Sequence, residues 1–414
     1  DPRAIGGGVA ASAIAYSGPL VINTPTLVRA RVLSGGTWSA ITEFTFYPPQ
    51  DLSKLVLTEL MYHPPDLGLT DGDEFEFLEL KNAGTNTLNL DGFKFTAGIS
   101  FTFTNGTQLG PGQFFVLARN PGALQTRYPG LVVNGTYSGR LDNAGETVQL
   151  SSPNGGVVWS VTYNDRAPWP LAADGHGFSV VPRQPLAHPN SDNGVHWRAS
   201  SVAGGSPGAD DPEPTLPPVV VNEVLTRTTP PQVDWIELFN PTDAEADLSG
   251  WFLSDDGGAP IKYRLPQGTT LPPRSYRVFT EEQFNAQPLL VTSFSLDSMG
   301  DAVYLSSGDA ATNLTGYSHG FSFGAAANGV SFGRYVNSVG EEQFPAQLSV
   351  TPGAANSAPR VGPVVIQEIH YHPGLGGDEF IELGNVTGNE VPLFDPAFPT
   401  NTWRVNGLSF HFPP

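Results

Sequence analysis

One short phrase occurs three times in the chain and constrains its fold more than any other feature. Each copy is an apolar run ending in Glu, a loop with proline, and then an aromatic, an aliphatic, Glu, Leu, any residue and Asn. The copies span residues 55–82, 219–240 and 364–385. The spacing of the two glutamates is identical in the second and third copies. Internal repetition of this kind predicts tandem domains of one fold.

The composition favours short strands over long helices. The 414 residues include 47 Gly and 39 Pro, which break helices and build turns. Hydrophobic residues at 39% and aromatic residues at 11% are enough for packed cores. A chain of this length is expected to hold roughly three domains.

The first two copies continue in parallel beyond the phrase. Leu90-Asp-Gly-Phe93 corresponds to Leu248-Ser-Gly-Trp251, and a terminal Ser206-Pro-Gly208 corresponds to Thr351-Pro-Gly353. Short strand patterns separated by Gly, Pro and Asn turns are typical of a β-sandwich. The proline-rich segments 209–218 and 354–363 are predicted to be extended, semi-rigid linkers.

The second copy carries almost all of a known pattern. Its residues are Asp234-Trp-Ile-Glu-Leu238, Asn240, Asp247 to Asp255, Pro266 to Pro272, and Thr351-Pro-Gly353. The pattern resembles the lamin tail domain, an Ig-like β-sandwich. The first copy departs by having Phe77 and Phe93 in place of Trp, and the third has Leu393-Phe394 where Leu-Ser is expected. The resemblance is specific for fold and says little about function.

The first 49 residues carry a different pattern. Its elements are Asp1-Pro2, Tyr16-Ser-Gly-Pro19, Val28 to Arg31, Trp38-Ser39 and Phe46. They resemble the second half of the fibronectin-III-like domain at the C-terminal side of chitobiase and β-hexosaminidase-type proteins. We therefore expect part of such a unit here, within a segment of a longer protein.

The predicted fold class is all-β, with tandem Ig-like β-sandwiches arranged as beads on a string. The predicted units are a partial fibronectin-III-like domain, two complete lamin-tail-like sandwiches and the start of a third, at residues 1–49, 51–212, 217–357 and 361–414.

The paired glutamates of the phrase allow two interpretations. Two carboxylates about 5 Å apart would suit a retaining glycosidase. However, Leu78 and Leu80 alternate with Glu79, so the aliphatic face is the core face and the glutamate lies on the outer face or at an edge. There it can accept hydrogen bonds from loop amides. We favour structural roles, with Asn turning the chain, for Glu59, Glu79, Asn82, Glu223, Trp235, Glu237, Asn240, Trp251, Glu368, Glu382 and Asn385.

Other candidate sites are weaker. No cysteine is present, and no cofactor is predicted. Calcium is a weak prediction at acidic turns that do not fit the EF-hand pattern, with candidate ligands Asp71, Asp73, Asp255 and Asp256. His63 and His372 recur in Tyr-His-Pro and are predicted to be partly exposed loop residues. Trp169 and Trp197 are expected to be freer than the other tryptophans and to offer faces for sugar stacking.

The net charge of −20 argues against nucleic acid and anionic lipid as partners. No apolar run reaches the length of a membrane span, so we expect no direct membrane insertion in this segment. No catalytic motif is found.

We predict a non-enzymatic adhesive or scaffolding array of a large secreted or cell-surface bacterial protein. Its expected partners are other surface proteins or extracellular polysaccharide, with self-assembly through the repeats. The alternative is a carbohydrate- or substrate-binding accessory module of an enzyme elsewhere in the full chain, since bacterial lamin-tail domains resemble parts of proteins with spore-coat-H-like kinase or hydrolase domains.

Overall fold

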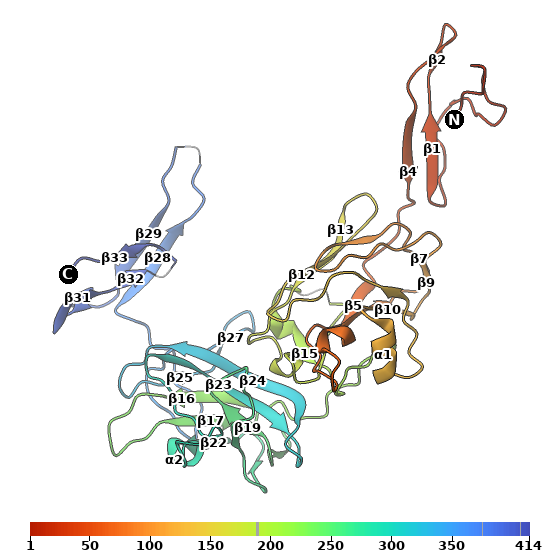
Figure 1. Ribbon diagram of the computed structural model, residues 1–414. Coiled ribbons are helices and arrows are strands. Elements are labelled where there is room, and N and C mark those ends of the chain that lie inside the picture. The colour runs from red at the N-terminus through yellow and green to blue at the C-terminus, as the bar shows by residue number, and fades with distance from the viewer. Residues whose placement is uncertain (188–189, 375, 406) are drawn as a thin grey trace.

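The structure is a computed structural model that describes residues 1–187, 190–374, 376–405 and 407–414. Its regular structure is almost entirely β, and the strands gather into separate units along the chain (Figure 1). The predicted all-β class with tandem Ig-like sandwiches is confirmed. Among the described residues, no helix is long and apolar enough to cross a membrane.

The first sandwich packs two sheets over one core. The larger sheet has the strand order β11 (Gly135–Thr136), β10 (Phe114–Ala118), β6 (Phe77–Asn82), β5 (Leu55–Met61), β14 (Val180–Pro182), β15 (Trp197–Ala199). The smaller sheet has the order β13 (Val157–Thr162), β12 (Thr147–Ser151), β8 (Lys94–Ala97). A short strand pair, β7 (Leu88–Asn89) with β9 (Gln108–Leu109), lies beside these sheets. The helical elements are one α-helix, α1 (Pro121–Arg127), and the 3-10 helices η1 (Gly72–Phe75), η2 (Leu171–Ala173) and η3 (Gly194–His196).

The second sandwich repeats this plan. One sheet has the order β22 (Tyr276–Thr280), β17 (Trp235–Phe239), β16 (Val220–Leu225), β25 (Phe332–Gly333). The facing sheet has the order β20 (Tyr263–Arg264), β19 (Phe252–Ser254), β23 (Gly300–Gly308), β24 (Leu314–Gly324). The smaller elements are β18 (Ala246–Asp247) with β21 (Thr270–Leu271), β26 (Tyr335–Val336) with β27 (Glu342–Gln343), and α2 (Glu281–Phe284).

The phrase forms the same hairpin in both sandwiches, β5 with β6 and β16 with β17. Its aliphatic face lies in the core: Leu78 and Leu80 are fully buried in the first sandwich, as are Ile236 and Leu238 in the second. The opposite face is also covered. In the first sandwich Phe77 lies in a second small cluster with Leu124 of α1. The alternation therefore identifies the face of the hairpin that lies in the main core, and a second, smaller apolar cluster covers the opposite face of the hairpin in the first sandwich.

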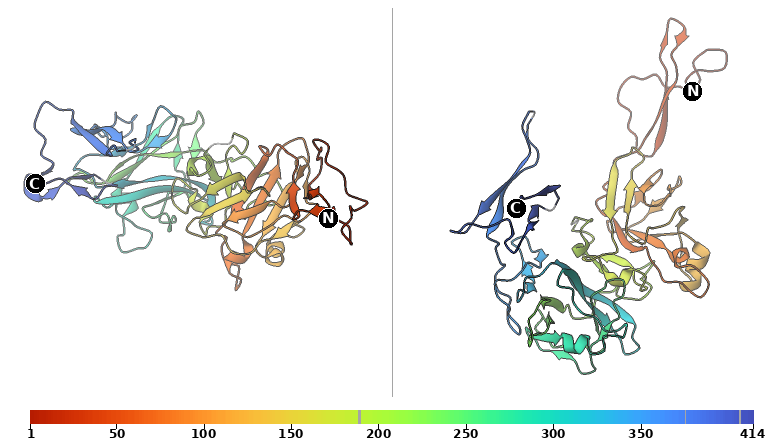
Figure 2. Two further views of the ribbon diagram at one scale, coloured as in Figure 1. Left: turned by 90° about the horizontal axis from the view of Figure 1, so that it is seen from above. Right: turned by 60° about the vertical axis from the view of Figure 1, so that its left-hand side comes forward.

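The segments at the two ends are hairpins with little burial. Residues 1–46 form β1 (Thr26–Ala30) with β4 (Thr42–Phe46) and β2 (Leu33–Ser34) with β3 (Thr37–Trp38). The third copy of the phrase forms β28 (Val364–His370) with β29 (Phe380–Asn385), followed by β30 (Phe394–Asp395) with β31 (Phe398–Thr402) and β32 (Arg404–Val405) with β33 (Phe410–His411). Both ends project away from the two sandwiches (Figure 2).

The two sandwiches share an apolar contact. Ala172, Phe178 and Ala199 of the first form one buried cluster with Phe252 and Leu314 of the second. The backbone N–H of Leu171 also donates to Ser318 Oγ at 3.3 Å. The first-sandwich residues of this contact lie in the segment after β13, which is longer than the equivalent segment after β24 and includes η2, an element that the second sandwich does not have. The two sandwiches are therefore packed against each other and are not joined by the linker alone.

Candidate functional site

A β-bulge precedes the first glutamate in every copy of the phrase. The register shifts between Leu57 and Glu59, between Val221 and Glu223, and between Ile366 and Glu368. The extra residue is Thr58 in the first copy and Asn222 in the second. A bulge re-aims a side chain relative to a regular strand. Here it directs a hydrogen-bond donor at the second glutamate.

In the first sandwich the glutamate pair binds the segment Ser206-Pro-Gly208, which we call the closing loop of that sandwich. The Ser206 N–H donates to Glu59 Oε1 at 2.9 Å, and the Gly208 N–H donates to Glu79 Oε2 at 2.5 Å. The Ser179 hydroxyl donates to Glu59 and the bulge residue Thr58 donates to Glu79, at 2.5 and 2.7 Å. The carboxylates thus hold a loop that lies far from them in sequence.

The second sandwich repeats these bonds on its own closing loop, Thr351-Pro-Gly353. The Thr351 N–H donates to Glu223 Oε1 at 3.1 Å, and the Gly353 N–H donates to Glu237 Oε2 at 2.5 Å. Further donors are the Thr351 hydroxyl and the Ser331 hydroxyl on Glu223, and the bulge residue Asn222 on Glu237, at 2.7, 2.5 and 2.8 Å. The glutamate pair is therefore a repeated latch for the end of each domain.

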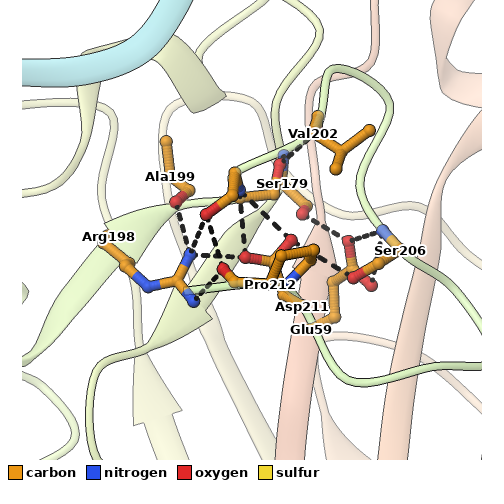
Figure 3. A network of polar contacts seen from close by, with 10 residues as sticks. Glu59, Ser179, Arg198, Ala199, Val202, Ser206, Asp211 and Pro212 are labelled. Carbon is orange, nitrogen blue, oxygen red and sulfur yellow. Dashed lines mark hydrogen bonds and ion pairs between the residues drawn. The ribbon is translucent and has the colours of Figure 1, made fainter. Parts of the chain in front are cut away.

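The latch of the first sandwich continues into the linker, as Figure 3 shows. Arg198 of β15 donates to Asp211 Oδ2 at 2.5 Å, and the Ser201 N–H donates to the same oxygen at 2.9 Å. The Ser206 hydroxyl also donates to Asp211, at 3.2 Å. Gly205, with φ of +83°, lies so close to Glu59 that a Cβ would be 1.9 Å from Oε1. The start of the linker is thereby fixed to the domain that precedes it.

Burial raises the pKa of three carboxyls of the two latches. Glu59, Glu79, Glu223 and Glu237 are each at most 1% exposed. Burial raises the pKa of Glu59 to about 8, against the opposing effect of its hydrogen-bond donors. In the same way burial raises the pKa of Glu79 and of Glu237 to about 7. Removing charged groups from water favours their neutral form.

The third copy of the phrase presents the same groups to solvent. Glu368 and Glu382 are exposed, and within the described part of the chain neither makes a side-chain hydrogen bond or an ion pair. The bulge is already formed there, between Ile366 and Glu368. The hairpin geometry therefore does not depend on the closing loop.

The Asn that ends the phrase hydrogen-bonds its own turn in all three copies. Asn82 Nδ2 donates to the carbonyl of Asn86 and Asn240 Nδ2 to that of Ala244, at 2.8 and 2.7 Å. Asn385 makes the equivalent bond to Asn389 at 2.8 Å. In the two sandwiches the same amide also reaches the carbonyl of Leu109 or Leu271. These bonds tie the turn after the hairpin to a neighbouring short strand.

The four tryptophans discussed in the sequence analysis are packed. Trp235 and Trp251 are 8% and 3% exposed. The expectation that Trp169 and Trp197 are freer is wrong, because they are 6% and 5% exposed and stack on each other with ring centroids 5.5 Å apart. The proline-rich segment that carries them folds back onto the first sandwich instead of forming a free loop.

The acidic turns make contacts within the protein. Asp71 caps η1 by accepting the Asp73 N–H at 3.0 Å, and Asp73 pairs with Arg119 at 3.1 Å. In the second sandwich Asp255 pairs with Lys262, and Asp256 accepts the Gly258 N–H at 2.9 Å. Within the described residues no group of three or more His, Cys, Asp or Glu side chains is placed to hold a metal ion. Calcium binding stays a prediction without a defined site.

Two further polar groups are His63, which the sequence predicts to be a partly exposed loop residue, and Glu76, which the sequence does not single out. His63 lies at a half-exposed position and its Nδ1 is 2.5 Å from Asp174 Oδ1, which raises the pKa of His63. Glu76 is fully buried and accepts from the Tyr137 hydroxyl at 2.9 Å and the Leu141 N–H at 3.0 Å. Burial raises the pKa of Glu76 to about 7. Glu76 comes directly before β6 and adds a third buried carboxyl to the first sandwich.

Gly316 permits the close approach of the two sandwiches. It has φ of +100°, and a Cβ there would lie 3.0 Å from the Ser200 carbonyl and 3.1 Å from the Phe178 ring. We expect Gly316→Val to separate the sandwiches, because the side chain clashes and the backbone conformation disfavours a β-branched residue. Small-angle scattering should show a larger radius of gyration, and proteolysis within 209–218 should become faster.

The control for this change lies on the same strand. Gly324 has no atom within 4 Å of the position of a Cβ. Gly324→Val should therefore leave the radius of gyration and the proteolysis rate unchanged. Equal behaviour of the two variants would show that the contact between the sandwiches does not depend on Gly316.

Comparison with known proteins gives one family. The sequence model of the lamin tail domain matches residues 48–165 and 212–319. Neither the search of curated proteins nor that of solved structures gives a match. The two matched regions contain the two copies of the phrase that form complete sandwiches with latched closing loops. Since the matches cover more than half of the sequence, the chain belongs to the lamin tail domain family and carries this Ig-like, non-catalytic domain in tandem.

Proposed function

We propose that the chain is a non-catalytic scaffolding or adhesive array within a large secreted or cell-surface bacterial protein. The observation that carries this proposal is the latch. The recurring carboxylate pairs, which are the groups best suited to acid–base chemistry, are sealed beneath the closing loops. A substrate has no access to a carboxyl that is at most 1% exposed.

The packing of the two sandwiches supports a mechanical role. A scaffold transmits position between its ends, and this needs domains that keep a fixed relation. The shared cluster around Phe178 and Leu314 and the pinned linker at Asp211 supply that relation. The expected partners are other surface proteins or extracellular polysaccharide, and the repeats offer a route to self-assembly. The first 49 residues are proposed to be part of a chitobiase-type, fibronectin-III-like unit.

The proposal is tested by assaying the purified chain on panels of glycans, carboxylic esters and phosphate esters. We expect no turnover above the buffer rate. Turnover that survives further purification would contradict the scaffolding role, particularly if it disappeared in a Glu59→Gln or Glu237→Gln variant that remained folded by circular dichroism. A variant that loses stability without any activity to lose supports the structural role.

A further inference from the structure

A cavity of about 460 Å³ lies where the two sandwiches and their linker meet. Its walls come from three parts of the chain: Pro168, Pro170, Arg183 and residues 197–201 of the first sandwich, residues 214–216 and Pro218 of the linker, and residues 315–318 of β24. This volume is within the range of small-molecule sites, which often lie between domains. The cavity exists only because the segment after β13 packs on the second sandwich.

The hydroxyl groups of the wall have few protons to offer a ligand. Three of them donate within the protein: Ser200 to the carbonyl of Val202 at 2.8 Å, Ser201 to the carbonyl of Pro212 at 2.6 Å, and Thr315 to the hydroxyl of Ser307 at 2.7 Å. The hydroxyl of Tyr317 likewise donates to the carbonyl of Val219 at 2.9 Å. Each oxygen keeps acceptor lone pairs. The wall therefore suits a ligand that brings several hydrogen-bond donors.

The two arginines of the wall differ in how many of their hydrogen-bond donors are already used within the protein. Arg198 is engaged with Asp211 and with the carbonyl of Pro212. Arg183 is exposed, and its Nε donates to the carbonyl of Val195 at 3.1 Å. Within the described ranges, the two terminal nitrogens of Arg183 make no hydrogen bond or ion pair. In a chain with a net charge of −20, Arg183 is thus a cation with free donors beside a cavity.

The remaining wall is apolar and partly aromatic. Trp197 lines the cavity but is packed against Trp169, so the accessible surface comes from the half-buried ring of Tyr317 and the flat aliphatic side chains of Pro168, Pro170 and Pro218. Such surfaces pack against the C–H faces of sugar rings, while the guanidinium fork matches a carboxylate. The ligand that meets all three requirements has one carboxylate, several hydroxyl donors and an apolar ring face.

We infer that the cavity between the two sandwiches binds a saccharide residue that bears a carboxylate, with Arg183 as the partner of the acid group. The hydroxyls of the sugar donate to the oxygens of the wall, and its ring lies against Tyr317 and the proline side chains. A ligand held in this way contacts both sandwiches and the linker, so it also stabilises their packing. The inference goes beyond the scaffolding role and does not depend on it.

The experiment is a calorimetric titration of the full 414-residue chain. The probes are a disaccharide containing glucuronic acid, the glucose disaccharide of the same linkage, and sodium acetate. We expect the acidic disaccharide to bind, and the neutral disaccharide and acetate to bind at least about tenfold more weakly, because the neutral sugar lacks the carboxylate and acetate lacks both the hydroxyl donors and the ring face. Arg183→Gln should weaken binding of the acidic disaccharide by at least about tenfold.

The matched control is Arg166→Gln, which removes an arginine whose side chain is 85% exposed and which does not line the cavity. It should bind the acidic disaccharide as the unaltered chain does. The inference is overturned if the acidic disaccharide does not bind, if acetate or the neutral disaccharide binds equally well, or if Arg183→Gln binds normally. Thermal melts by circular dichroism establish that both variants are folded. Failure of binding leaves the scaffolding proposal standing, whereas catalytic turnover would contradict that proposal alone.

Discussion

Replacing Glu223 by alanine is expected to lower the free energy of unfolding of the second sandwich by about 3–5 kcal/mol. Glu223 accepts hydrogen bonds from the Thr351 N–H, the Thr351 hydroxyl and the Ser331 hydroxyl. Alanine removes the partner of the fully buried Ser331 hydroxyl and of the two half-buried Thr351 donors, and each unsatisfied buried donor costs about 1–3 kcal/mol. Urea unfolding measures the loss, and hydrogen exchange of β16 and β17 assigns it to this sandwich.

The chain contains its own control for this effect. Glu368 occupies the same position in the third copy of the phrase and follows the same bulge, but it is exposed. Glu368→Ala should change stability by no more than about 0.5 kcal/mol, as surface substitutions usually do. If the two substitutions had equal effects, the importance of Glu223 would lie in the hairpin itself and not in its hold on the closing loop.

The sequence predicts the domain plan well because that plan rests on local patterns. Alternation within the phrase identifies Leu78, Leu80, Ile236 and Leu238 as core residues, and all four are fully buried in the sandwich cores. Repetition of the pattern predicts two sandwiches of one fold, and their sheets share the order of the four equivalent strands. Neither step needs contacts between distant positions.

The latch depends on distant positions, so its full form could not be derived from alternation. Ser206 lies 147 positions after the glutamate that it binds. Alternation places Glu59 and Glu79 away from the main core, but it does not say which loop covers them. A signal was nevertheless present, because a side chain that can donate hydrogen bonds precedes the first glutamate in every copy, as Thr58, Asn222 and Gln367.

The contact between the sandwiches was missed for a different reason. It is built by a segment that is longer in the first repeat than in the second and includes η2, which has no equivalent there, so comparison of the repeats gives little information about it. The same segment carries Trp169 and Trp197, whose mutual stacking depends on tertiary folding of a proline-rich stretch. Composition alone favours an open loop for such a stretch.

The first sandwich is expected to be more stable at about pH 5.5 than at about pH 8, by several kcal/mol. Burial raises the pKa of Glu59 to about 8 and the pKa of Glu76 and Glu79 to about 7. Between the ordinary glutamate value of 4.5 and these values, the folded state holds protons that the unfolded state has released. Stability therefore falls as the pH rises through this window, and it changes no further through these groups above about pH 8.

Two histidines of the same sandwich, His63 and His176, act in opposite directions. The pKa of His63 is raised by its bond to Asp174, so its contribution is also lost as the pH rises. The pKa of His176 is lowered by burial, which destabilises the fold as the pH falls through the ordinary histidine range. The buried carboxyls are more numerous than these histidines and their pKa shifts are large, so we expect the folded state to be more stable at the lower pH. Urea midpoints at the two pH values measure the difference.

Glu59→Gln separates this effect from the repulsion among surface charges. A net charge of −20 at neutral pH also destabilises the fold as the pH rises, whichever groups are buried. Glutamine keeps the shape of Glu59 and can still accept the Ser206 N–H, but it has no proton to release. The difference between the urea midpoints at the two pH values should therefore be smaller in the variant. The difference that remains measures the repulsion among surface charges together with the titration of Glu76 and Glu79. An unchanged difference would mean that Glu59 keeps its charge in the folded state, stabilised by its hydrogen-bond donors against the cost of burial.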